Sequence, residues 1–153
     1  MAAHRLAEIL VIAILAAGCA TEYQKSGATG GFKETQLAPD MFRVSFTGNS
    51  FTPTDRVQDY ALLRAAEITL ENKAKYFAVV SSADQTRRNT YVTPGTAYTD
   101  KKGTTTYTSG DVQTYYHPGV GMMIRTFPAK PKGEMAFDAE FLVKSLRAKY
   151  EIK

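Results

Sequence analysis

Hydrophobic and polar residues alternate along residues 41–46 (MFRVSF), and this alternation predicts a β-strand. Because successive side chains of a strand point to opposite sides, the three apolar members would face a core and the polar ones water. Residues 76–80 (YFAVV) and the apolar stretch 120–127 (VGMMIRTF) predict two more strands, the first of them buried on both faces or central in a sheet.

Two segments have the apolar spacing of helices, residues 53–73 and residues 136–150. Thr52 is the expected N-cap of the first helix, with Pro53 at its first helical position. The apolar residues of this helix form two stripes on either side of a narrow charged strip, which consists of Arg64, Glu67 and Glu71. A helix that is apolar on so much of its circumference should be well buried.

Residues 84–116 differ from the rest of the chain because they are rich in Thr, Tyr, Ser and Gly. Their β-propensity favours a long, mostly exposed hairpin, whereas their low apolar content favours a disordered insertion. The order strand, helix, strand, polar insertion, strand, helix predicts an α+β fold. We expect a single two-layer domain over residues 32–153, with a small, mainly antiparallel sheet packed by two helices and a long polar hairpin insertion.

The N-terminus has the pattern of a targeting segment. Residues 9–17 are nine consecutive apolar residues, too few for a bilayer-spanning helix, which needs about 20. Small residues then lead directly into Cys19, an arrangement that resembles the lipobox of bacterial lipoproteins. We therefore expect residues 1–18 to be a signal peptide and Cys19 to carry the lipid. The polar, aperiodic sequence that follows predicts a flexible tether over residues 19–31.

Composition narrows the possible functions. Hydrophobic residues make up 44% of the chain, which is ordinary for a globular protein, and the formal net charge is +4. The basic residues are scattered rather than gathered into a stripe, which argues against nucleic-acid binding. The chain has one cysteine, so an intramolecular disulfide is impossible, and we expect no metal site and no cofactor.

Candidate sites are few. His117 lies in a turn-like segment without a nucleophile or carboxylate in the pattern of a catalytic group, and a surface histidine is the favoured interpretation. The strip Arg64, Glu67 and Glu71 has two interpretations. It could be a polar site for an anionic ligand or a partner protein, or, as we favour, an intrahelical ion pair at the rim of the core that also bonds the buried backbone of the segment 31–39. The tyrosines of residues 84–116 could form a contact surface, or they could equally have no specific role. No catalytic constellation is present, and we expect a protein that is not an enzyme.

Part of the sequence is similar to a known family. The stretches 34–39 (ETQLAP), 46–50 (FTGNS) and 62–67 (LLRAAE) resemble a family of short Gram-negative lipoproteins of uncharacterised function. The resemblance covers residues 19–82 well and the C-terminal strand and helix loosely. It implies the localisation and the fold, and it implies no activity.

These observations lead to one expectation and one alternative. We expect a lipoprotein anchored by Cys19 in the cell envelope, with Ala20 favouring the outer membrane, facing the periplasm. It would be a non-enzymatic interaction or structural module, in contact with an envelope protein or peptidoglycan. The alternative is a periplasmic small-ligand binder or sensor that uses Arg64, Glu67 and Glu71.

Overall fold

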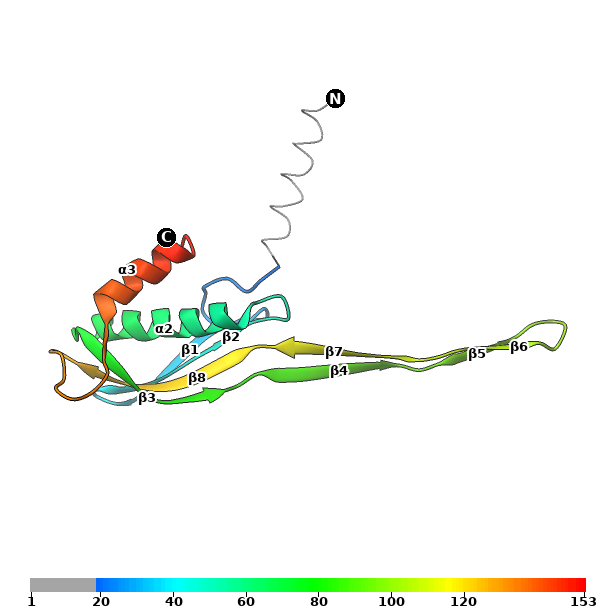
Figure 1. The fold of residues 1–153 in the computed structure, drawn as a ribbon, viewed down its shortest axis with the longest axis horizontal. Coiled ribbons are helices and arrows are strands. Elements are labelled where there is room, and N and C mark those ends of the chain that lie inside the picture. Colours follow the sequence, from blue (N-terminus) through cyan, green and yellow to red (C-terminus); the bar gives the residue numbers. More distant parts are fainter. Residues whose placement is uncertain (1–18) are drawn as a thin grey trace, which may run out of the picture.

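The computed structural model describes residues 19–153, and the predicted signal peptide lies outside the described residues. The described chain mixes helices with antiparallel sheets, which confirms the α+β class (Figure 1). Its elements are, in chain order, β1 (Gly31–Ala38), β2 (Met41–Thr47), α2 (Thr54–Glu71), β3 (Tyr76–Asp84), β4 (Arg87–Thr93), β5 (Thr96–Thr99), β6 (Thr105–Thr108), β7 (Asp111–His117), β8 (Gly119–Phe127), β9 (Phe137–Asp138) and α3 (Ala139–Lys149).

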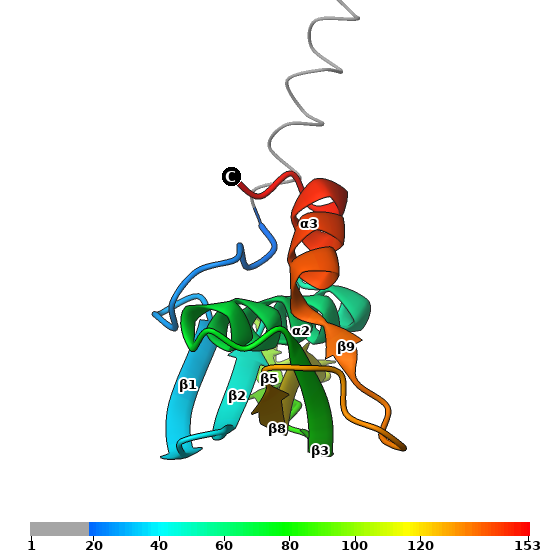
Figure 2. The ribbon, with the colours of Figure 1, turned by 90° about the vertical axis from the view of Figure 1, so that its left-hand side faces the viewer.

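The main sheet has the strand order β1-β2-β8-β3-β9, and every pairing is antiparallel. Helix α2 covers one face of this sheet (Figure 2). The alternation predicted for β2 is confirmed, because its three apolar side chains are buried and pair with apolar residues of β8 in the core. These pairs are Phe42↔Ile124, Val44↔Met122 and Phe46↔Val120.

Helix α3 does not lie beside α2 on the sheet, as the two-layer prediction required. It packs on the outer side of α2, and it begins directly after the short strand β9 (Figure 2). Asp138 caps α3, since its side chain accepts a hydrogen bond from the backbone N–H of Phe141 at 3.0 Å. The reason for the stacking is that α2 is buried against the sheet on one side and still offers polar and apolar partners to α3 on the other.

The ends of α2 differ in detail from the prediction. Pro53 is the N-cap, and its side chain has no group that could cap the helix. The hydroxyl of Thr52, the predicted cap, instead accepts from the N–H of Thr21 and donates to the Oδ1 of Asn49. At the other end Lys73 adopts a φ of 60°, and the N–H of Ala74 donates to the carbonyl of Thr69 at 3.0 Å. A lysine thus occupies the left-handed position that glycine commonly takes after a helix.

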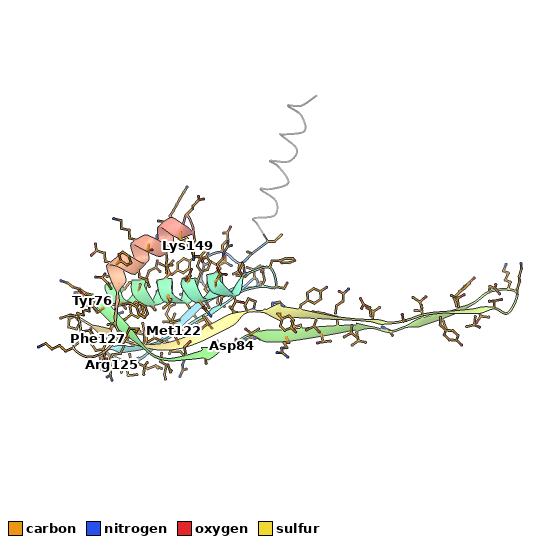
Figure 3. All side chains as sticks on the ribbon, viewed as in Figure 1. Tyr76, Asp84, Met122, Arg125, Phe127 and Lys149 are labelled. Atoms are coloured by element: carbon orange, nitrogen blue, oxygen red, sulfur yellow. The ribbon has the colours of Figure 1, made fainter. Side chains whose placement is uncertain are left out.

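Residues 85–118, which we call the arm, continue the β3–β8 ladder beyond the domain. The ladder has a bulge between Val79 and Ser81, but from Ser81↔Met123 to Thr99↔Thr105 the register does not shift. Figure 1 shows β4, β5, β6 and β7 as one thin ribbon that leaves the domain, and Figure 3 places Asp84 where the sheet passes into this ribbon. At about 3.4 Å per residue, the paired strands of the arm extend about 40 Å.

Candidate functional site

The residues that follow Cys19 are bound to the domain. Thr21 is only 2% exposed. Its backbone N–H donates to the Oγ1 of Thr52 at 2.8 Å, and its own hydroxyl donates to the carbonyl of Thr29 at 2.6 Å. That hydroxyl also accepts from the N–H of Asn49 at 2.9 Å. The Nδ2 of Asn49 donates to the carbonyl of Cys19 at 2.6 Å, and Cys19 itself is exposed to solvent.

The next residues extend the same attachment. The ring of Tyr23 packs against Phe32 and Tyr60, with centroid distances of 5.1 and 5.4 Å. The chain then doubles back, with the N–H of Ser26 donating to the carbonyl of Phe32 at 2.9 Å. Residues 21–31 therefore belong to the folded domain, rather than to the flexible tether that their polar composition predicts. The prediction was wrong because a few buried groups, spread among polar residues, leave no periodic pattern.

Gly30 shows how tightly this segment approaches the sheet. Its φ is 107°, and a Cβ at this position would lie 2.2 Å from the carbonyl oxygen of Thr47. Only glycine combines that φ with so close a backbone contact. Gly31 is in the same situation, because a Cβ there would lie 2.5 Å from the carbonyl oxygen of Gln24, so these two glycines serve close packing.

The strip Arg64, Glu67 and Glu71 forms a paired charge cluster rather than an open site. Arg64 contacts Glu67 at 3.2 Å and Glu71 at 2.8 Å, and its other nitrogen atoms reach Glu34 of β1 at 3.3 Å. The Arg64 and Glu67 side chains are 13% and 12% exposed, whereas that of Glu71 is 56% exposed. Burial by itself lowers the pKa of Arg64, but its hydrogen bonds to Glu71 and Glu34 raise that pKa above the ordinary value.

Glu67 connects three parts of the molecule. Its Oε2 accepts hydrogen bonds from Arg64 and from the hydroxyl of Tyr23, and its Oε1 accepts from Arg147 of α3 at 2.6 Å. Burial, and then the hydrogen bond to Glu67, raise the pKa of Tyr23 above its ordinary value. The favoured structural interpretation of the strip agrees with this geometry, although Arg64 bonds a side chain of β1 and not its backbone. A small-ligand site on the strip required an open cleft, and these charges instead neutralise one another.

His117 is the last residue of β7, at the base of the arm. Its Nε2 lies 3.4 Å from the Nδ2 of Asn89, on the facing strand. Two depressions adjoin it: one is lined by Tyr91, Gln113 and Tyr115 of the arm, and the other lies toward the N-terminal segment. Within residues 19–153, no carboxylate or hydroxyl is hydrogen-bonded to this imidazole.

The surface of the arm is polar and aromatic on both sides. Its tyrosines and valines are exposed, up to 80% for Tyr107. Tyr91 and Tyr115 meet edge to face at a centroid distance of 5.8 Å, and the hydroxyl of Tyr115 donates to Gln113 at 2.6 Å. None of the residues in β4, β5 and β6 is buried, so the arm adds nothing to the core of the domain.

Residues 19–153 contain no group of three or more His, Cys, Asp and Glu side chains that is placed to hold a metal ion. Within the same range, no helix has the length and apolar character needed to cross a bilayer. Comparison of the chain with family models, with curated proteins and with solved structures found no match.

Sequence reasoning missed the groups that hold the N-terminal segment in place. Thr21 and Tyr23 lie in a polar stretch, and their partners Thr52 and Glu67 are about 30 and 44 residues away in the chain. The one available signal was Tyr23, an aromatic residue that a solvated tether does not need.

Proposed function

We propose that this chain is a lipoprotein of the bacterial cell envelope, anchored through Cys19, whose arm makes contact with another envelope component. The lipobox-like sequence supports the anchor, and Ala20 favours the periplasmic face of the outer membrane. The fold is an α+β domain in which the arm is an insertion between β3 and β8. The role is one of interaction or structure, without catalysis.

The observation that carries this proposal is the arm itself. It extends about 40 Å with the strand geometry of an ordinary sheet, and within residues 19–153 no third strand pairs with it. Isolated two-stranded ribbons are marginally stable in water, and an exposed strand edge is a template for pairing. Such an element fits a protein whose arm is completed by a partner.

The chemistry of the arm indicates the kind of partner. Residues 89–99 carry no charge, and residues 105–116 carry only Asp111. Tyrosine offers apolar area together with a hydroxyl at low entropic cost, and threonine and glutamine side chains add hydrogen bonds. This combination suits a protein surface or the sugar strands of peptidoglycan, and the experiment below separates them.

Site-specific photocrosslinking in cells tests the proposal. A photoreactive residue is placed at Tyr107 or Tyr91 on the arm, and at Leu37 of β1 as a control that is exposed on the domain. We expect crosslinked products from the two arm positions and not from Leu37. A discrete band would identify a protein partner, and label retained in purified sacculi would identify peptidoglycan. Equal products from all three positions, or none from the arm, would contradict the proposal.

A further inference from the structure

The loop at residues 48–52, which we call the anchor loop, lies directly against Cys19. Asn49 organises it: its Oδ1 accepts from the N–H of Phe51 at 3.0 Å and from the hydroxyl of Thr52 at 2.9 Å, while its Nδ2 binds the Cys19 carbonyl. Two residues after Cys19 the chain is already buried at Thr21. Two residues of chain reach about 7 Å at most, so a lipid on Cys19 holds the anchor loop at the bilayer surface.

Phe51 is the apolar side chain that this loop presents to the outside. It is 68% exposed, and it lies two residues from the asparagine that binds Cys19. A single exposed phenylalanine elsewhere on a protein needs no explanation. Beside a lipid anchor, however, an aromatic side chain is within reach of the boundary between headgroups and acyl chains, where interfacial segments bury their apolar residues.

A basic depression adjoins the same loop. It has a volume of about 350 Å³ and lies between the turn 26–30, the anchor loop and the base of the arm. Lys33, Arg87 and His117 line it, and no aspartate or glutamate does. Over residues 19–153, Lys33 and Arg87 take part in no salt bridge. Their charges are therefore available to an anion.

Phosphate is the anion that such a position would meet. Asn49 lines both this depression and the smaller one beside Cys19, so the two adjoin. A headgroup phosphate next to the anchor could accept hydrogen bonds from a guanidinium and an ammonium, which are the usual partners of phosphate in proteins. Basic residues at an anionic membrane surface each contribute about 1 kcal/mol of attraction.

We propose that the anchor loop and the basic depression form a membrane-contacting surface, in which Phe51 enters the bilayer interface and Lys33 and Arg87 bind the headgroups of anionic phospholipids. This inference rests on the proposed lipid anchor at Cys19. It adds that the bilayer is a binding partner of the folded domain and not only of the lipid. The arm starts at this surface, since Arg87, Asn89 and His117 at its base line the depression.

A tryptophan at position 51 tests the insertion. The chain has no tryptophan, so Phe51→Trp gives a fluorescence signal from this residue alone, and Tyr107→Trp is the matched control on the arm. Each variant, in its mature lipidated form, is reconstituted into vesicles of phosphatidylcholine with phosphatidylglycerol. We expect blue-shifted emission from position 51 that lipids with brominated acyl chains quench, and water-like, unquenched emission from position 107. Water-like emission from position 51 would overturn the inference.

Charge variants in the same Phe51→Trp background test the headgroup site. Replacing Lys33 and Arg87 together by Gln should reduce the quenching in vesicles that contain phosphatidylglycerol and leave it unchanged in pure phosphatidylcholine. Lys101→Gln with Lys102→Gln removes the same charge from the tip of the arm and should have no effect. An equal loss in both double variants would refute a localised site.

Intact mass of each reconstituted sample separates this inference from the anchor on which it rests. A protein without acyl mass would contradict the lipid anchor. Acylated protein with position 51 in water would leave the anchor standing and overturn only the membrane-contacting surface.

Discussion

Replacing Glu67 by Ala should destabilise the domain far more than replacing Glu71, the exposed acid of the same charge cluster. Glu67 is 12% exposed and accepts hydrogen bonds from Arg64, Arg147 and the Tyr23 hydroxyl. Arg64 keeps Glu34 and Glu71 when Glu67 is removed, but Arg147 loses the acid that its guanidinium binds at 2.6 Å, and Tyr23 loses its acceptor.

The magnitude follows from how far these groups are buried. A hydrogen bond to a charged group contributes roughly 1.5–3 kcal/mol, and Arg147, which is 37% exposed, recovers part of its loss from water. Two such bonds give about 3 kcal/mol for Glu67→Ala, at the lower end of the range for breaking a buried ion pair. For a domain of this size, that corresponds to a fall in Tm on the order of 10 °C.

Urea unfolding, followed by circular dichroism, measures this loss, and Glu71→Ala is the control. Glu71 binds the same Arg64 from the same helix face, but it is 56% exposed, so its removal should cost no more than about 1 kcal/mol. A double-mutant cycle with Arg147→Ala should recover a coupling energy of about 1–2 kcal/mol. If Glu67→Ala costs no more than Glu71→Ala, the reasoning about the cluster is refuted.

Three further predictions concern the N-terminal segment. Thr21→Val keeps the shape of the side chain but removes its hydroxyl, so the unfolding free energy should fall by roughly 1–3 kcal/mol. The backbone N–H of Asn49, which donates to that hydroxyl, should also exchange faster with deuterium, and unchanged exchange would argue for a loosely held segment. Gly30→Ala should cost at least about 2 kcal/mol in urea unfolding, whereas Gly121→Ala, where the added methyl meets only a flexible glutamine side chain, should cost clearly less; equal costs would contradict the close backbone contact. Folding raises the pKa of Tyr23, so the protonated hydroxyl stabilises the fold fully below its unfolded pKa of about 10, and this stabilisation is lost as the pH rises above that value. The free energy of unfolding should therefore fall more steeply above about pH 10 in the native protein than in Tyr23→Phe, and identical slopes would exclude this role.

The elements that sequence reasoning could predict are those that bury one regular face. Strand β2 has three buried apolar residues at strand spacing, and α2 has buried residues along two of its sides. Strand β1 escaped prediction because, apart from Gly31 at its start, none of its residues is buried, so its pattern of polar residues carries no periodic signal. The N-terminal segment escaped prediction for the same reason, because its attachment depends on isolated buried groups such as Thr21.

In the charge cluster, the contacts within one helix could be predicted from the sequence, and the contacts between elements could not. The spacing of Arg64 and Glu67 on one helix face predicts that they are neighbours. The partners contributed by Glu34, Tyr23 and Arg147 come from β1, the N-terminal segment and α3. No spacing rule connects residues so far apart in the chain, and only the fold brings them together.

The arm was open to two interpretations for a physical reason. Threonine, tyrosine and valine favour strands, but strand propensity is weak without burial, and here nothing is buried. The fold favours strands here because the β3–β8 ladder continues into the arm without a shift in register. The sequence of the arm alone does not show this pairing.

Intact mass combined with membrane fractionation, for the native protein beside Cys19→Ala, tests the central proposal most directly. The native protein should begin at Cys19, carry acyl mass and be recovered with the outer membrane, while the variant should have no acyl group and leave the membrane fraction. If both forms are unmodified and soluble, the lipid anchor is wrong, and residues 1–18 belong to the mature protein.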